Sequence, residues 1–173
     1  MSVTINGNGT ITGYTPTTIS GTLGASKMPD GTILQTQKVT TTSSQQISAN
    51  STWTDTALSL NITPNFSNSL IFLTLHCRWG NTSSASNGLR LYKDSTTVVD
   101  GNNDFLHNAG YNLGGNRQVE DGSYAFFDTA GGTSQINYKI QCRVTNGHFT
   151  FNGRGGETNS PMTAYLIAQE IKV

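Results

Sequence analysis

Hydrophobic and polar residues alternate most clearly in residues 70–79, which read LIFLTLHCRW. Successive side chains of a β-strand point to opposite faces, so one face would be apolar throughout, from Ile71 to Trp79. The opposite face begins apolar, at Leu70 and Phe72, and is polar by His76. This pattern predicts a strand inside a sheet, with one face on the core and the other only partly covered.

Comparable patterns elsewhere predict a chain of about nine strands separated by turns, with almost no helix. Residues 56–62 are expected to pair antiparallel with 70–79, because a polar turn containing Pro64 joins them. Asn146 and Gly147 form the strongest hairpin signal, and a strand at 148–151 follows them. The other strands are expected at residues 32–41, 89–93, 96–100, 123–128, 135–145 and 162–173, with loops at 42–52 and 101–122.

These strands predict an all-β fold, a jelly-roll-like antiparallel β-sandwich that forms a head domain over residues 31–173. The last strand, 162–173, is apolar on both faces. Such a strand fits burial between its own core and a neighbouring subunit, which predicts a homotrimer. The expected trimer interface consists of Leu70, Phe72, His76, Leu166 and Ala168.

Residues 1–30 differ from the rest, because they are rich in Gly, Thr and Ser and have few apolar side chains to bury. A segment of this kind cannot fold on its own. We expect an arm that is ordered only on a partner or another subunit, and that docks on other proteins of an assembly. Its candidate docking residues are Val3, Ile5, Ile11, Tyr14, Ile19 and Leu23.

The charge composition argues against two classes of partner. The formal net charge is zero, only 12% of residues are charged, and no window is rich in Lys or Arg, so no nucleic-acid partner is expected. No apolar run reaches the length of a membrane span or of a secretory signal, so we expect no membrane insertion and assembly in a cytoplasm. Cys77 and Cys142 lie on apolar strand faces and are expected to be buried, reduced thiols.

The residues show no clustering of the kind that catalysis needs, and we predict a protein that is not an enzyme and needs no cofactor. The histidines, His76, His107 and His148, lie far apart in the sequence. The adjacent Glu120 and Asp121 would suit a glycosidase only with suitable geometry, and solvated loop acids are the simpler interpretation. His76 is either a hydrogen-bonded interface residue, which we favour, or one of three copies that bind an ion on a three-fold axis.

Three loops, at residues 81–87, 101–122 and 153–160, combine aromatic, Asn and Arg residues. Such residues suit stacking and adaptable polar contacts with a sugar or a protein, although plain solvated loop tips are an equal alternative. The candidate outward binding residues are Phe105, His107, Tyr111, Arg117 and Arg154.

Several short motifs, taken in order, resemble virion proteins of bacteriophages. The opening run, MSVTINGNGTITG, resembles that of short virion proteins from phages of aquatic bacteria, especially cyanophages. The later runs are similar to the β-sandwich module that recurs in phage tail fibres and other appendages, namely PDGTILQ (29–35), LSLNITP (58–64), SLIF (69–72), LRLYK (89–93), FFDTA (126–130) and INYK (136–139). Together they cover nearly the whole chain.

The resemblance implies a trimer with an N-terminal docking segment and a distal jelly-roll head, and it supplies no catalytic residues. The expected function is that of a virion structural protein, a short tail fibre or appendage that contacts a glycan or protein of the host surface. The close alternative is a cement or decoration protein that stabilises the capsid and uses the arm as a strap. A polysaccharide-degrading enzyme is the third and least favoured reading.

Overall fold

A computed structural model of the chain describes residues 24–48, 52–82, 86–94, 96–97, 106–109, 118–155 and 162–173. Its central strand is β4 (Leu70–Asn81). Ile71, Leu73, Leu75 and Cys77 are fully buried on one face, whereas the residues between them are partly exposed. The alternation predicted for residues 70–79 is therefore confirmed.

Among the described residues, one sheet has six strands, and β4 lies inside it. One edge of β4 pairs with β11 along its first half and with β10 near its end, while the other edge pairs with β8 along its whole length. Beyond β11 lies β1, and beyond β10 lies β2. The strands that join β4 in this sheet are β1 (Ile33–Thr41), β2 (Gln45–Ser48), β8 (Gln118–Thr129), β10 (His148–Phe151) and β11 (Ala164–Ile171).

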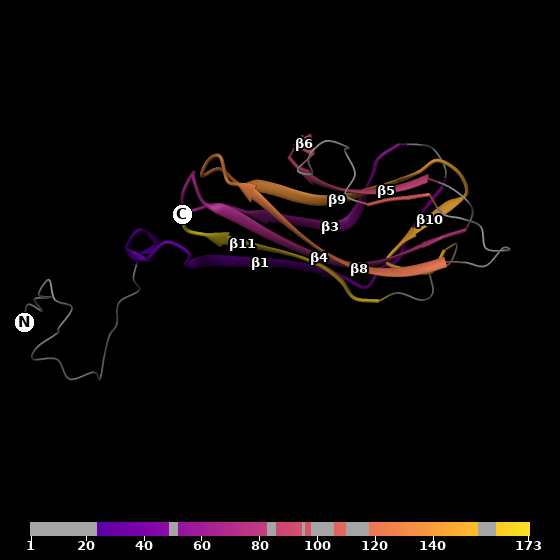
Figure 1. Cartoon of the computed structure of the whole chain (residues 1–173), viewed down its shortest axis with the longest axis horizontal. Helices are drawn as coiled ribbons and strands as arrows, with labels where there is room; N and C mark the ends of the chain where they lie inside the picture. Colours follow the sequence, from indigo (N-terminus) through magenta and orange to yellow (C-terminus); the bar gives the residue numbers. More distant parts are fainter. Residues whose placement is uncertain are drawn as a thin grey trace, which may run out of the picture.

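In the part of the chain that the structure describes, the second sheet has five strands. Four of them follow the order β3-β9-β5-β6, and β7 also pairs with β5. Figure 1 shows this sheet as one layer and the six-stranded sheet as the other. Its strands are β3 (Thr54–Ile62), β5 (Ser86–Lys93), β6 (Thr96–Thr97), β7 (Leu106–Ala109) and β9 (Ile136–Val144). All pairings in both sheets are antiparallel. The all-β, two-sheet architecture is confirmed, and the jelly-roll topology and the trimer stay predictions.

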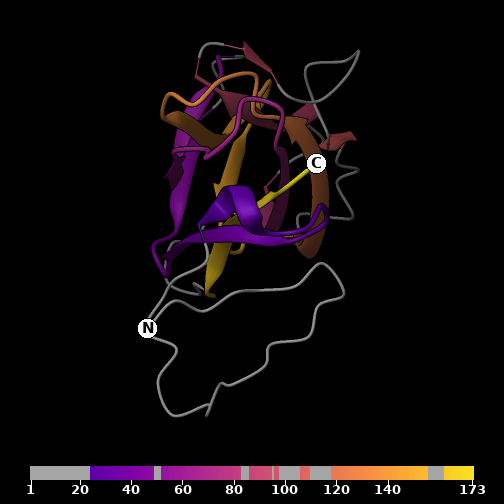
Figure 2. The same ribbon diagram turned by 90° about the vertical axis from the view of Figure 1, so that its left-hand side faces the viewer.

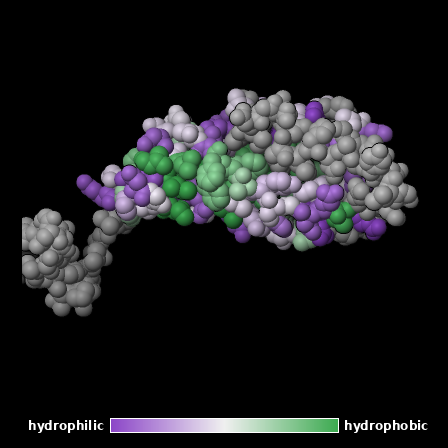
Figure 3. All heavy atoms as spheres, viewed as in Figure 1, coloured by the Kyte–Doolittle hydropathy of each residue, from purple (hydrophilic) through white to green (hydrophobic). Residues whose placement is uncertain are grey.

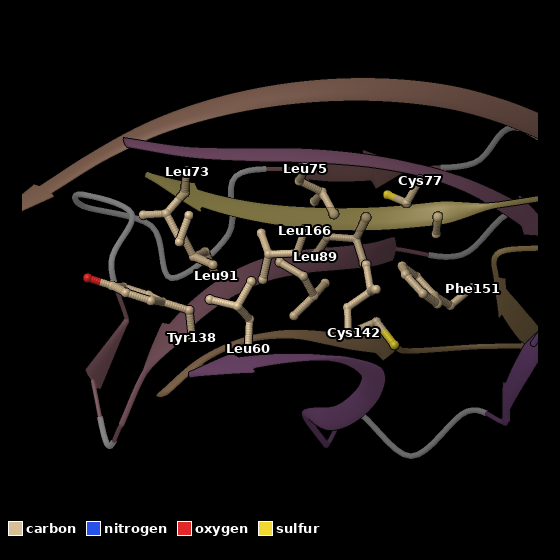
Figure 4. Close-up of a cluster of buried hydrophobic side chains, with 14 of the residues drawn as sticks. Leu60, Leu73, Leu75, Cys77, Leu89, Leu91, Tyr138, Cys142, Phe151 and Leu166 are labelled. Atoms are coloured by element: carbon tan, nitrogen blue, oxygen red, sulfur yellow. The ribbon is translucent and has the colours of Figure 1, made fainter. Parts of the chain in front are cut away.

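The core fills the space between the two sheets (Figure 4). Leu73, Leu75 and Leu166 extend from the six-stranded sheet toward Leu89 and Leu91 of the five-stranded sheet. The alternate positions of β9 that face the core are all buried, namely Ile136, Tyr138, Ile140, Cys142 and Val144. Burying large apolar side chains stabilises such a fold by about 1.5–3 kcal/mol each.

The structure corrects several predicted connections. The strands at 56–62 and 70–79 are not neighbours, because β3 pairs with β9 in one sheet while β4 lies in the other. Asn146 and Gly147 do turn the chain, but β9 and β10 belong to different sheets, so the turn crosses the sandwich rather than closing a hairpin. The predicted loops at 42–52 and 101–122 also contain β2, β7 and the start of β8.

The two ends of the described chain meet at one end of the sandwich. The 3-10 turn η1 (Ala25–Lys27) precedes β1, and Figures 1 and 2 show it at the same end as the C-terminus. Gly31 donates its N–H to the carbonyl oxygen of Lys172 at 2.8 Å, and the Lys172 ammonium donates to the carbonyl oxygen of Met28. Residues 24–32 are therefore attached to the last strand, and the division at residue 30 stays a prediction.

Candidate interaction surfaces

The outer side of the six-stranded sheet carries a group of apolar side chains, which we call the apolar face. Strand register brings them together across four strands, because Ile171 pairs with both Ile33 and Leu70, and Phe72 pairs with Phe127. Ile33 is 51% exposed and Phe127 is 65% exposed. The apolar face consists of Ile33, Leu70, Phe72, Phe127, Ile167 and Ile171.

An aromatic pair lies on the side of this face formed by β4 and β8. The ring centroids of Phe72 and Phe127 are 4.8 Å apart. Figure 3 shows hydrophobic side chains gathered where β8 ends and β4 begins. Contiguous exposed apolar patches are typical of sites that bind another protein, whereas single exposed apolar residues are ordinary. Leu70 and Phe72, two of the predicted interface residues, therefore lie where an interface is physically favoured.

The same sheet face becomes polar along β4, at His76. Nδ1 of His76 lies 2.9 Å from the Ser123 hydroxyl, and its ring stacks on Tyr165 with centroids 5.3 Å apart. The ammonium of Lys38 also lies over the Tyr165 ring, 5.3 Å from the ring centroid. His76 is thus a hydrogen-bonded histidine at the rim of the apolar face, and its place in a subunit interface stays a prediction.

Two predicted interface residues are corrected by the structure. Leu166 and Ala168 have no exposed surface and point into the core of their own chain. The half-buried side chains of β11 are instead on the opposite face, namely Tyr165, Ile167, Gln169 and Ile171. The last strand does have apolar side chains on both faces, but the face expected at the subunit interface is the one that faces the core.

Most of the other predicted site residues lie outside the described residues. These are the arm residues Val3, Ile5, Ile11, Tyr14, Ile19 and Leu23, and the loop residues Phe105, Tyr111 and Arg117. Arg154 is described and exposed. The backbone of His107 belongs to β7 and pairs with Gly88 of β5.

One member of the acidic pair considered for catalysis, Asp121, forms an ion pair with Arg78. Arg78 donates to both carboxylate oxygens of Asp121 at 2.8 and 3.0 Å. This hydrogen bonding lowers the pKa of Asp121, although partial burial opposes it. Among the described residues, no group of three or more His, Cys, Asp or Glu could hold a metal ion. Within the same part of the chain, no helix is long and apolar enough to cross a membrane.

A second surface covers the outer side of the five-stranded sheet, and we call it the aromatic–cation face. The Arg90 guanidinium carbon lies 4.3 Å from the Trp53 ring centroid and 4.7 Å from that of Tyr92. The Arg143 guanidinium carbon lies 4.7 Å from the same Trp53 ring. The ammonium of Lys139 lies 5.4 Å from the Tyr92 ring. The aromatic–cation face consists of Trp53, Arg90, Tyr92, Lys139 and Arg143, all partly exposed.

Two further side chains, Gln141 and Asp55, link members of this face to one another. Gln141 accepts from Nε of Arg90 at 2.6 Å and donates to Asp55 at 2.5 Å. Asp55 also forms an ion pair with Lys139 at 2.7 Å. Burial alone would raise the pKa of Asp55, but the hydrogen bonds from Lys139 and Gln141 and the charge of Arg90 outweigh it and lower the pKa.

The aromatic–cation face was not predicted from the sequence. Its members come one or two at a time from β5, β9 and the residue before β3, and each lies at the polar position of an ordinary alternating pattern. A signal was nevertheless present. Arg90, Tyr92, Lys139 and Arg143 occupy the outward positions of two strands, where small polar residues would suffice.

Comparisons with known proteins include a weak structural neighbour. No protein-family model matches this chain, and no curated protein is similar to it. Among solved structures, a chain in the structure of infectious bursal disease virus Gx strain is similar to it, with 14% sequence identity and a TM-score of 0.27. The similarity covers 82% of this chain and 37% of that one. A likeness of this size supports no inference about function, and the comparisons assign the chain to no family.

Proposed function

We propose that this chain is a non-enzymatic structural protein of a bacteriophage virion. In this proposal it assembles as a homotrimer and contacts the host surface as a short tail fibre or appendage. The observation that carries the proposal is the apolar face, with Phe127 65% exposed beside Phe72. The sequence resemblance to phage appendage modules supplies the virion context.

The apolar face favours contact between copies of the chain for an energetic reason. Each large apolar side chain that leaves water on assembly contributes about 25 cal/mol per Å² of buried apolar surface. Association must also offset the loss of translational and rotational freedom, which costs at least about 4 kcal/mol. The six side chains of the apolar face can offset this cost when a second copy of the chain covers them.

The position of β8 supports the same interface. In the described part of the chain β8 pairs only with β4, so it is an edge strand of twelve residues. Long edge strands are normally covered or blunted, because their outer backbone groups can pair with another chain. Phe127 and Val119 are both exposed on β8. A neighbouring subunit would therefore cover the edge of β8 together with the apolar face.

The mass of the full-length chain in solution tests the assembly. We expect a particle of three times 18.5 kDa for the natural sequence in analytical ultracentrifugation. Phe127→Asp should give monomers with an unchanged circular dichroism spectrum, because it places a charge in the interface. Met162→Asp is the matched control, since Met162 is also exposed but lies outside the apolar face. A monomeric natural protein, or a Phe127→Asp trimer, would contradict the proposal.

The location of the protein in the virion tests its role. Electron cryomicroscopy of the particle that carries this chain should show its density at the distal end of the tail. Density spread over the capsid lattice would contradict the host-contact role. It would favour the cement or decoration protein, in which the arm of residues 1–30 holds the capsid.

A further inference from the structure

We infer that the aromatic–cation face binds a saccharide that carries carboxylate groups. This inference deepens the host-contact role and rests on the proposed function for its biological setting. The chemistry itself stands on the contacts of the face, which are independent of the trimer and of the position in the virion.

Strand register places the members of the face in adjacent rows. Asp55 of β3 lies opposite Gln141 of β9, and Gln141 lies opposite Arg90 of β5. In the next row Tyr92 lies opposite Lys139. Directly opposed residues in antiparallel strands have Cβ atoms about 4.5–5.5 Å apart. The face is therefore a continuous array of rings, amides and charges on a rigid sheet.

The cations of this array are held in place before any ligand arrives. Arg90 lies against two rings, Trp53 and Tyr92, and its Nε also donates to Gln141. Arg143 contacts the same Trp53 ring. Fixing a long side chain on binding normally costs about 0.5–1.5 kcal/mol. Stacking and hydrogen bonding remove much of that cost for both guanidinium groups, which favours binding of an anion.

The charge of the face is positive. The face has three cations, Arg90, Lys139 and Arg143, and Asp55 forms an ion pair with Lys139. The chain as a whole has ten Lys and Arg residues balanced by ten Asp and Glu residues. Three cations and one carboxylate give the face a local excess of positive charge that attracts anions, in a chain whose formal net charge is zero.

The combination of groups selects the chemistry of the ligand. A guanidinium group binds a carboxylate through paired N–H donors. The partly exposed rings of Trp53 and Tyr92 offer apolar surface to the C–H groups of a sugar ring. A saccharide with carboxylates uses both kinds of group. The pairing of His107 with Gly88, opposite Arg143, also brings part of the predicted 101–122 binding loop to this face.

The full chain can be titrated with two probes, an oligogalacturonate and an oligomer of sialic acid, by calorimetry and tryptophan fluorescence. Trp53 is on the face and the other tryptophan, Trp79, is buried, so binding should change the emission of Trp53. We expect at least one probe to bind, and its methyl ester to bind about tenfold more weakly. Arg143→Gln should weaken binding about tenfold, and Arg143→Lys should restore it only in part.

The matched control is Lys38→Gln, which removes one cation from the outer side of the other sheet. It should leave the affinity unchanged. The inference is overturned if neither probe binds the natural protein, if the methyl esters bind as tightly, or if Lys38→Gln weakens binding as much as Arg143→Gln. Equal or tighter binding of polyglutamate would overturn it in favour of an acidic peptide. A monomeric protein or a capsid location would contradict the proposed function and leave this titration unaffected.

Discussion

Glu170 is a carboxylate with no exposed surface, on the core-facing side of β11. It accepts hydrogen bonds from the side chains of Gln35 and Ser69, both at 2.7 Å, and from the backbone and side chain of Asn65 at 2.7 and 2.8 Å. The backbone N–H of Phe66 donates to it at 3.3 Å. Burial alone would raise the pKa of Glu170, but the hydrogen bonds outweigh it and lower the pKa.

Glu170→Gln should therefore lower the free energy of unfolding by about 2–4 kcal/mol at neutral pH. The amide keeps the shape, but it turns an N–H₂ group toward donors that need an acceptor. Because the folded pKa is depressed, the natural protein has this stabilisation above the unfolded pKa of about 4.3 and loses it as the pH falls through the folded pKa. Urea unfolding at several pH values measures both effects.

The free energy of unfolding of Glu170→Gln should fall less steeply with decreasing pH than that of the natural protein. Glu120→Gln is the control, because Glu120 is exposed on β8 and its removal should change stability by less than about 1 kcal/mol. A difference between Glu170→Gln and the natural protein that stayed the same from neutral to acid pH would contradict the assigned role of the carboxylate.

At the scale of elements, β8 depends on close contact with β4. Gly122 of β8 lies opposite Cys77, and a Cβ atom at this position would be 2.5 Å from the Trp79 ring and 2.8 Å from that of Tyr124. Gly122→Ala should lower the free energy of unfolding by about 1–3 kcal/mol, although Ala is otherwise the better strand residue. Chemical denaturation and the near-ultraviolet circular dichroism of Trp79 measure the effect.

Gly132→Ala is the matched control for this substitution, since a Cβ atom there meets nothing within 4 Å. It should change the free energy of unfolding by less than about 0.5 kcal/mol. Equal destabilisation by the two variants would mean that the contact between Gly122 and Trp79 does not limit the approach of β8 to β4.

The strands could be predicted from the sequence because alternation is a property of each segment alone. Pairing partners could not, because residues 54–62 have the same alternation whether they join the sheet of β4 or the facing sheet. Gly147 has a φ of 69°, so the predicted turn is present. Nothing in Asn146–Gly147 fixes whether the chain returns beside β9 or crosses the core. The missed strand β2 has one buried apolar residue, Ile47, which is too weak a signal.

The candidate surfaces were predicted only in part, for a related reason. The face shared by Leu70 and Phe72 follows from alternation within one strand. In β11, both Leu166 and Ile167 are apolar, so the pattern does not tell which of them faces the core. The aromatic–cation face is assembled from residues as far apart as Trp53 and Arg143. Its existence depends on sheet order, which no local pattern contains.

At the scale of the whole molecule, each sheet contributes one cysteine to the shared core, Cys77 from β4 and Cys142 from β9. Both are free and buried, as the sequence predicted. Burial, together with the nearby charge of Asp121, raises the pKa of Cys77 to about 12. Burial and the neighbouring Cys77 also raise the pKa of Cys142. Only thiolates react quickly with disulfide reagents, so both groups should be inert in the folded protein.

Exposure of either thiol requires the two sheets to separate, because the residues around both belong to one continuous core. With excess dithionitrobenzoate at about pH 8 we therefore expect both thiols to react in a single phase, at the rate of global unfolding. Cys142→Ala should leave Cys77 as the remaining thiol. Its reaction should be faster than in the natural protein only to the extent that the substitution destabilises the fold. Fast reaction of one thiol while the other stays protected would show instead that one end of the sandwich opens alone, so that its two sheets do not unfold as one cooperative unit.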